Sequence, residues 1–272
     1  NQMMKTLLKL EWHKFRKNSV VIALSAIFVA LFPLIILTGK KVFANVPPPM
    51  PGSITFYEFP TVWDYQGYVG NWFVSFCLGF MMVYMITSEV SNRTQRQSII
   101  NGLTRKEYWM SKISVLLSLS FVATLMYVVS SILLGLIHTD GYDFEIIWDN
   151  NFAIPRFFMM CLGYLSFAFF VAVWIRKGTL AILVYFSYIM FIEPVIRAIH
   201  LYYFNNRSTL FYPMNVVEDL MPNPFFKLPD VWLEKEWGFK ILLSHTEALG
   251  FSALYIALFI SLSWWIFMKK DI

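Results

Sequence analysis

Hydrophobic residues gather along this chain in six long runs that are separated by shorter polar segments. Because every backbone N–H and C=O group inside a bilayer must find its partner within the segment, apolar runs of roughly 20 residues predict membrane-spanning helices. Barrel strands would instead alternate apolar and polar residues over about 10 positions. The predicted spans lie at about 19–38, 67–88, 113–137, 153–175, 179–200 and 246–268.

The segment ahead of the first span, residues 1–18, is basic and amphipathic. Apolar residues fall on one helical arc with basic residues at its edge: Met4, Leu7, Leu8, Trp12 and Phe15 on the arc, and Lys5, Lys9 and Arg16 beside it. A disordered basic leader is the alternative. The aromatic residues on the apolar arc favour a helix that lies in the headgroup layer.

Basic residues indicate the orientation of the spans. If the N-terminus is cytoplasmic, most of the 22 Lys and Arg residues fall on cytoplasmic segments, and the loop at 138–151 carries acids but no Lys or Arg. The positive-inside rule therefore predicts a multi-pass protein of the cytoplasmic or inner membrane with both termini in the cytoplasm. Residues 201–245 then form an extracytoplasmic loop, whose prolines and aromatic residues favour short helices against the outer leaflet.

The composition of the chain is typical of a membrane protein. The chain is 58% hydrophobic and only 14% charged. Its 22 Lys and Arg residues exceed the 17 Asp and Glu residues, but they flank apolar runs, so we expect no nucleic-acid-binding domain. Cys77 and Cys161 fall inside predicted spans, where we expect them to pack rather than to form a disulfide or bind a metal.

The sequence lacks the common motifs of ATP-binding, catalytic and metal-binding sites. The pair Gly39-Lys40 lacks the upstream glycine of a P-loop, and no HExxH, GxSxG or Cys-x-x-Cys motif occurs. We therefore expect no catalytic residue, no metal site and no ATP hydrolysis on this chain.

The most polar segment between two spans is 89–112. Within it, Ile99, Ile100 and Leu103 form a compact apolar arc, which predicts a short helix at about 92–103 with an apolar tip. An ordinary charged hairpin is the alternative. Exposed isoleucines are unfavourable unless a partner covers them, so the pattern favours a docking site for another protein.

Two helix starts carry the spacing of a capping box. Thr104 and Glu107 precede the third span, and Ser244 and Glu247 precede the sixth. Gly102 permits a turn just before the first box.

In the segment between its second and third spans, the chain resembles the membrane subunits of ABC-2 type ATP-binding cassette exporters. The similarity rests on Glu89, Thr94, the turn at 102–105 and Lys112, between the second and third spans. The amphipathic N-terminus resembles the connecting helix of that family, so the likeness covers essentially the whole chain. Many such permeases carry Gly before the Thr, where this chain has Arg93.

The resemblance implies an all-α polytopic membrane protein with the type V exporter fold. Two six-span permease subunits, identical or related, would face one another above two ABC-type ATPase subunits, which hold the ATP and Mg. The segment between spans two and three would be a coupling helix that docks on the ATPase and drives alternating access. The implied docking residues are Glu89, Arg93, Thr94, Gln97, Ile99, Ile100, Leu103 and Arg105, with Glu89 and Arg93 as orienting partners. The connecting helix would contribute Leu8, Trp12, Phe15 and Arg16.

Ionisable residues also occur near the outer end of the predicted spans. Glu193, Arg197 and His200 share one face of the fifth span, which Pro194 is expected to kink. Such groups are candidates for a translocation path or a polar network, together with Arg156. Alternatively, Arg197 and His200 reach the headgroups, while Glu193 pairs with Arg197 or Arg156.

A membrane scaffold or sensor is the competing hypothesis. It would bind a cytoplasmic partner through 89–112 and an extracytoplasmic partner through 201–245. A membrane enzyme ranks third, because it rests only on Glu193, Arg197 and His200.

Overall fold

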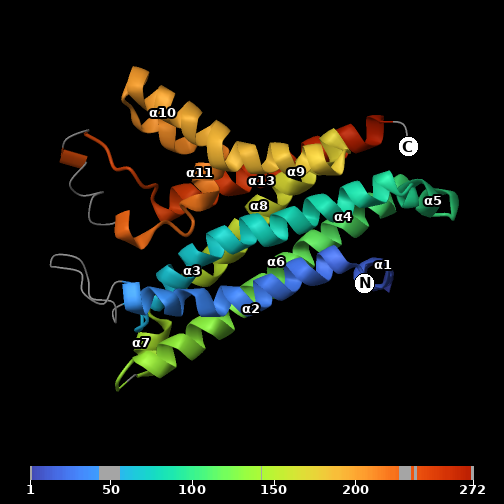
Figure 1. Ribbon diagram of the computed structural model, residues 1–272. Helices are drawn as coiled ribbons and strands as arrows, with labels where there is room; N and C mark the ends of the chain where they lie inside the picture. Colours follow the sequence, from blue (N-terminus) through green and yellow to red (C-terminus); the bar gives the residue numbers. More distant parts are fainter. Residues whose placement is uncertain (1, 43–55, 142, 227–233, 236–237, 271–272) are drawn as a thin grey trace.

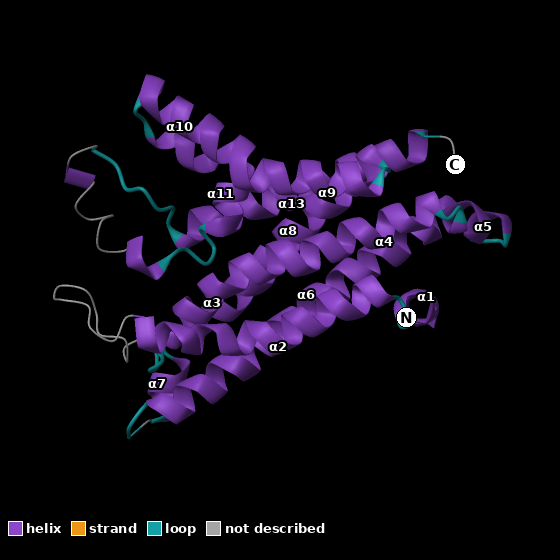
Figure 2. Ribbon diagram, in the orientation of Figure 1, coloured by secondary structure: helices purple, strands orange, loops and turns teal. Residues whose placement is uncertain are grey.

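The computed structural model is an elongated bundle of helices (Figure 1; Figure 2). It describes residues 2–42, 56–141, 143–226, 234–235 and 238–270. Within these residues all regular structure is helical. The Pro-rich stretch at 46–52 and part of the predicted 201–245 loop lie outside the described residues.

Six helical segments run along the bundle. They are α2 (Ser19–Val42); α3 (Val62–Phe73) joined by a π-helical turn (Val74–Leu78) to α4 (Gly79–Ser91); α6 (Arg105–His138); α8 (Ala153–Ile175); α9 (Gly178–Ser187) joined by a π-helical turn (Tyr188–Ile192) to α10 (Glu193–Phe204); and α13 (His245–Lys269). Five of the segments are long and apolar enough to cross a membrane. The sixth, α2, qualifies together with α1 (Gln2–Phe15), from which it is bent by 98°. This confirms an all-α polytopic membrane fold.

Several helices extend beyond the predicted spans. The third span begins at Arg105 rather than at 113, because Thr104 and Glu107 form the predicted capping box and start the helix in the polar segment. The sixth span begins at His245, directly after the N-cap Ser244, which forms the second predicted capping box with Glu247. Apolar runs therefore mark where a helix is buried in lipid, whereas caps mark where it begins.

α8 is the central helix of the bundle. It packs against α13, α4 and α6, and its side chains Phe157, Met160 and Cys161 are fully buried. The Phe157 ring stacks on Tyr127 with ring centroids 4.2 Å apart. Cys161 and Cys77 are both buried and free.

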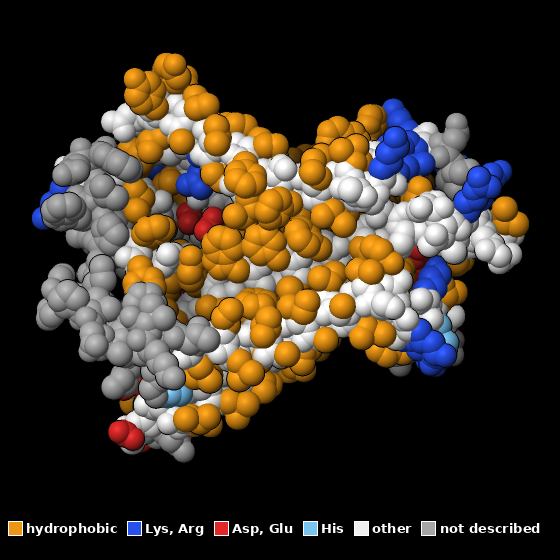
Figure 3. Space-filling view, viewed as in Figure 1, with side chains coloured by type: hydrophobic (Ala, Val, Ile, Leu, Met, Phe, Trp, Pro, Cys, Tyr) orange, Lys and Arg blue, Asp and Glu red, His pale blue; other side chains and the backbone are white. Residues whose placement is uncertain are grey.

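The two ends of the bundle differ in charge. α1, α5 (Thr94–Ile100) and the end of α13 lie together at one end, which we call the basic end (Figure 1). Arg176 belongs to it as well, since it lines one cavity with Gln95 of α5 and Phe267 of α13. Lys and Arg side chains gather there (Figure 3). The opposite end carries short helices, which are α7 (Phe144–Trp148), α11 (Pro213–Glu218) and two 3-10 turns (Arg207–Phe211 and Pro224–Phe226). In Figure 1, α10 leans away from the bundle at this end.

Close helix packing at Gly70 provides a test of the fold. A Cβ atom at Gly70 would lie 2.2 Å from Cε2 of Phe157, whereas one at Gly250 of α13 would meet nothing within 4 Å. Gly70→Ala should therefore destabilise the protein by about 1–3 kcal/mol, and Gly250→Ala should be neutral or slightly stabilising. Thermal unfolding in detergent, followed through exposure of the Cys77 and Cys161 thiols, measures both. Equal unfolding temperatures would contradict this packing.

Candidate functional site

Three charged side chains meet inside the basic end. Lys112 of α6 donates to Oε2 of Glu11 at 2.6 Å and also contacts Oε1 of Glu89. Glu11 belongs to α1 and Glu89 to α4, and each of the three residues is at most 3% exposed. We call these residues the buried ion cluster. It joins helices that are far apart in the sequence.

Further polar groups complete the cluster. The Tyr108 hydroxyl donates to Glu89 at 2.6 Å, and the Ser111 hydroxyl lies 3.2 Å from Glu11. Lys14, at the edge, lies 3.2 Å from Glu11 and 3.5 Å from Glu89. Two carboxylates thus face two ammonium groups, and the buried charges are balanced.

Glu11 is ionised within this cluster. Its burial opposes ionisation, but the nearby ammonium groups of Lys112 and Lys14 outweigh burial and hold the pKa of the carboxyl below its usual value. α1 is bent by 98° from α2 and lies at the basic end, among the Lys and Arg side chains. The charge of Glu11 is therefore present at neutral pH.

The buried side of α1 differs from the predicted apolar arc. Leu7, Glu11 and Phe15 are buried at a spacing of four residues, whereas Trp12 is 68% exposed. Leu8 is half-buried and Arg16 is exposed. The arc identified Phe15 correctly and missed Glu11. An acid placed four residues from both Leu7 and Phe15 was the available signal.

The predicted short helix at about 92–103 is α5, which has seven residues. Arg93 precedes it with φ 57°, in the left-handed region, and Gly102 follows it with φ 109°. Arg93 thus adopts the backbone conformation that Gly favours, so the local turn exists without glycine. The Thr94 hydroxyl donates to the backbone carbonyl of Glu89 at 3.2 Å, which ties α5 to the ion cluster.

The predicted docking residues occupy different environments on and around α5. Ile100 is 74% exposed, Gln97 is exposed, and Ile99 and Leu103 are half-buried. The tip of α5 is therefore apolar and accessible, as the sequence predicts. One side chain of α5 that was not predicted, Gln95, is buried.

Two of the predicted docking residues have other contacts. Arg105 donates to the backbone carbonyls of Met268 at 3.1 Å and Lys270 at 3.2 Å, so it fastens α6 to the end of α13. Glu89 and Arg93, the predicted orienting residues, lie in different environments. Glu89 turns inward to the buried ion cluster, while Arg93 is exposed at the left-handed turn.

At the opposite end, Glu193 binds backbone rather than a cation. Its carboxylate accepts hydrogen bonds from the backbone N–H groups of Met214 at 3.0 Å and Asn215 at 2.7 Å. No ion pair of Glu193 with Arg197 or Arg156 occurs among the described residues, so the alternative in which Glu193 pairs with one of them is wrong. The N–H groups at the start of α11 have no partner within that helix, and they attract the carboxylate.

The other predicted ionisable residues are held separately. Arg156 is 1% exposed and lies 3.4 Å from Asp64 Oδ1. His200 contacts the Tyr212 hydroxyl at 3.1 Å and the Ser208 hydroxyl at 2.8 Å. Arg197 has its Nε buried without a partner among the described residues. Arg156 and His200 thus bind different partners, and no hydrogen bond or ion pair joins them to Glu193 or Arg197 among the described residues.

Asp219 is a buried acid in the segment between α11 and α13. It is 4% exposed and accepts hydrogen bonds from Leu243 N at 3.1 Å and Asn215 Nδ2 at 3.3 Å. Burial raises the pKa of Asp219 to about 7, and the charge of Glu218 acts in the same direction. Sequence reasoning missed this residue, because its burial depends on the distant Leu243.

This architecture defines a class: a polytopic helical membrane protein with a short helix, α5, between two spans and a crosswise N-terminal helix at its basic end. The family model described as ABC-2 family transporter protein matches residues 7–192, which is more than half of the chain. The chain therefore belongs to that family, as the sequence predicts. None of the curated proteins compared matches it. The family identifies the chain as the membrane subunit of an ABC exporter and implies an ABC-type ATPase partner. The matched region includes the second half of α1, the buried ion cluster and α5.

Removing the central cation should destabilise the protein strongly. Lys112→Met leaves the carboxylates of Glu11 and Glu89 buried with only Lys14 nearby, which should lower the free energy of unfolding by about 3–5 kcal/mol. Lys106→Met, on the exposed first turn of the same helix, should change it by less than about 0.5 kcal/mol.

Thermal unfolding in detergent checks this pair. A variant that also carries Glu11→Gln and Glu89→Gln should recover part of the loss, because no uncompensated buried charge remains. Equal stability of Lys112→Met and Lys106→Met would show that the cluster does not hold the helices together.

Stability should also depend on pH through Asp219. Between about pH 4 and pH 7 the folded protein keeps a proton that the unfolded chain has released, so stability falls as pH rises through this window. Asp219→Asn should flatten this dependence, whereas Asp149→Asn, at an exposed acid, should not. Unfolding temperatures of the wild type and of both variants at pH 5 and pH 8 measure this pH dependence. An unchanged pH slope in Asp219→Asn would be the contrary result.

Proposed function

We propose that this chain is the permease subunit of an ATP-driven ABC-2 exporter of the cytoplasmic membrane, coupled to its ATPase through α5 and α1. The observation that carries this proposal is the accessible apolar tip of α5, held beside the buried ion cluster. Because the chain belongs to the ABC-2 family, the partner that we propose for this tip is an ABC-type ATPase.

Charge supports a cytoplasmic location for the basic end. Its exposed cations come from every segment that reaches it: Lys9, Arg16, Lys17, Arg93, Arg96, Lys106, Lys177 and Lys269. Cytoplasmic segments of membrane proteins carry such an excess of Lys and Arg. Both described ends of the chain lie here (Figure 1), so both termini are assigned to the cytoplasm.

The surface around α5 suits a protein partner. Ile100 projects from the tip, and exposed isoleucines are stabilised when a partner buries them. Between α1 and α5 lies a cavity of about 430 Å³ whose walls include the amides of Asn18, Asn92, Gln97 and Asn101. An ATPase surface with an apolar pocket and an acidic rim would complement this tip and the cations around it.

Movement of the ATPase would reach the spans through α5. α5 follows α4 at the left-handed Arg93 and precedes α6 at the capping box of Thr104. The buried ion cluster ties α1 to the same two helices. Closure of the ATPase dimer would therefore shift α1, α4 and α6 together and drive alternating access between two packed states.

The full transporter in this proposal contains two ATPase subunits and a second permease subunit. The second permease is a copy of this chain or a related chain, arranged around a two-fold axis. ATP and Mg bind to the ATPase subunits, because this chain has no P-loop. The scaffold or sensor hypothesis differs in requiring a partner that is not an ATPase.

A charge at the tip of α5 should block docking. Ile100→Asp should weaken binding of the ATPase subunit by at least about tenfold and abolish stimulated ATP turnover, with an unchanged unfolding temperature. Ile146→Asp, on α7 at the opposite end, should leave both intact. Pull-down in mild detergent and ATP hydrolysis by the reconstituted complex are the measurements.

Normal coupling in Ile100→Asp would contradict the docking role of α5. Capture of a partner without a Walker A motif, with no ATPase bound to the wild type, would instead support the scaffold hypothesis.

A further inference from the structure

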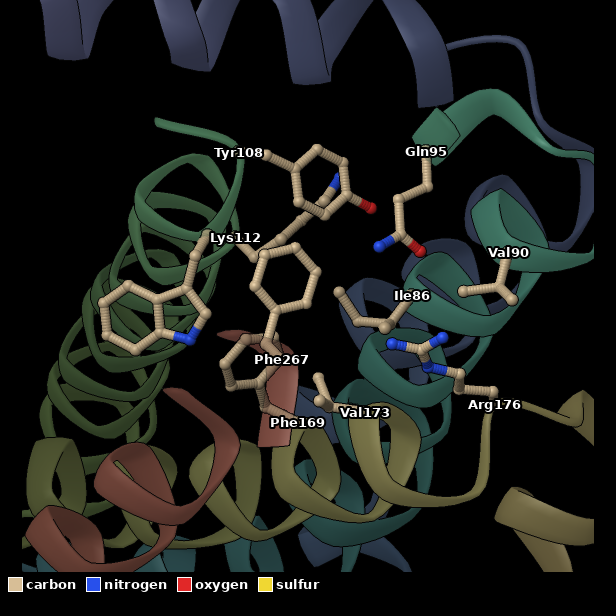
Figure 4. Close-up of a pocket in the computed structure, with 10 residues that line it drawn as sticks. Ile86, Val90, Gln95, Tyr108, Lys112, Phe169, Val173, Arg176 and Phe267 are labelled. Atoms are coloured by element: carbon tan, nitrogen blue, oxygen red, sulfur yellow. The ribbon is translucent and has the colours of Figure 1, made fainter. Parts of the chain in front are cut away.

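Gln95 is the one side chain of α5 that is buried, with 5% exposure. Its amide points into a small cavity inside the basic end, opposite the guanidinium of Arg176 (Figure 4). Side chains of α4, α6, α8 and α13 form the remaining walls. α5 thus reaches the interior of the basic end through a single side chain.

The cavity has the size of a water molecule. Its volume of about 10 Å³ is close to the minimum that holds one water. The Gln95 amide makes no hydrogen bond to another residue in the described part of the chain. A buried amide without a partner costs about 1–3 kcal/mol. A water in the cavity removes this cost, since it can bond to the amide and to a second polar group.

Arg176 provides that second group. It ends α8 with φ 59°, in the left-handed region, and begins the short turn to α9. Burial lowers the pKa of Arg176, and the smaller effect of Tyr108 raises it. The half-buried guanidinium lines the cavity, where an oxygen acceptor can accept a charge-assisted hydrogen bond from it.

We propose that Gln95 is a positioning residue that transmits movement of α5 to the turn between α8 and α9, through a water held between its amide and the Arg176 guanidinium. This inference rests on the proposed function of α5 as the docking helix. The chain joins α5 directly only to α4 and α6. Gln95 adds a route from α5 itself to the turn between the fourth and fifth spans, beside the direct packing of α4 on α8 and α9.

The test uses the full chain in lipid nanodiscs with the ATPase subunit that copurifies with it. Hydrogen exchange of peptides covering 174–182 is compared without nucleotide and with ATP plus vanadate. The wild type should show a nucleotide-dependent change in this turn. Gln95→Met keeps the volume but removes the amide, and it should reduce the change at least about fivefold while the ATPase stays bound.

Three variants separate transmission from docking and packing. Gln95→Glu retains an oxygen acceptor facing Arg176 and should retain the response. Gln97→Met makes the same chemical change on the exposed side of α5. It should weaken ATPase binding, yet keep the response once the ATPase is saturating. Arg176→Met should lose the response, and combining it with Gln95→Met should add nothing further.

Several results would overturn this role. If Gln95→Met shows a normal response at 174–182 with the ATPase bound, Gln95 does not transmit the movement of α5, and the proposed function still stands. Absence of ATPase binding to the wild type would overturn both. An experimental density map that resolves waters should show one between Gln95 and Arg176, and a dry cavity would contradict the proposal independently of any ATPase.

Discussion

The position of Lys112 between Glu11 and Glu89 is the interaction on which the basic end depends. Burying three charges is unfavourable unless each finds its partner at short range. The contacts here come from three helices, so the cluster is satisfied in one arrangement of α1, α4 and α6. It also accounts for the placement of α1, which turns 98° from α2 and packs against α6.

α5 takes its shape from this framework. A helix of seven residues is too short to be stable alone in water. Its start is fixed by the left-handed Arg93 and by Thr94 bound to the Glu89 carbonyl, and its end by Gly102 and the Thr104 cap. Since both ends are anchored, force on the exposed tip is carried into α4 and α6 rather than lost in a flexible loop.

The sequence predicted the spans, both capping boxes and the apolar tip of α5, because these features depend on residues close together in the chain. Glu11 was missed because its burial depends on Lys112, which is remote in the sequence. Gln95 was missed for the same reason, since α8 and α13 cover it. For Glu193 the sequence left a cation partner as one alternative, whereas its carboxylate accepts hydrogen bonds from the N–H groups of α11. Residues buried by distant segments are thus the part that local patterns do not determine.

The central claim is that α1, α4 and α6 move as one body at the basic end. Spin labels introduced by His13→Cys on α1 and Ser91→Cys on α4 lie at exposed positions and report the distance between these helices by double electron–electron resonance. With the ATPase bound, the distance distribution should be the same without nucleotide and with ATP plus vanadate. A shift of more than about 5 Å between the two states would contradict the account.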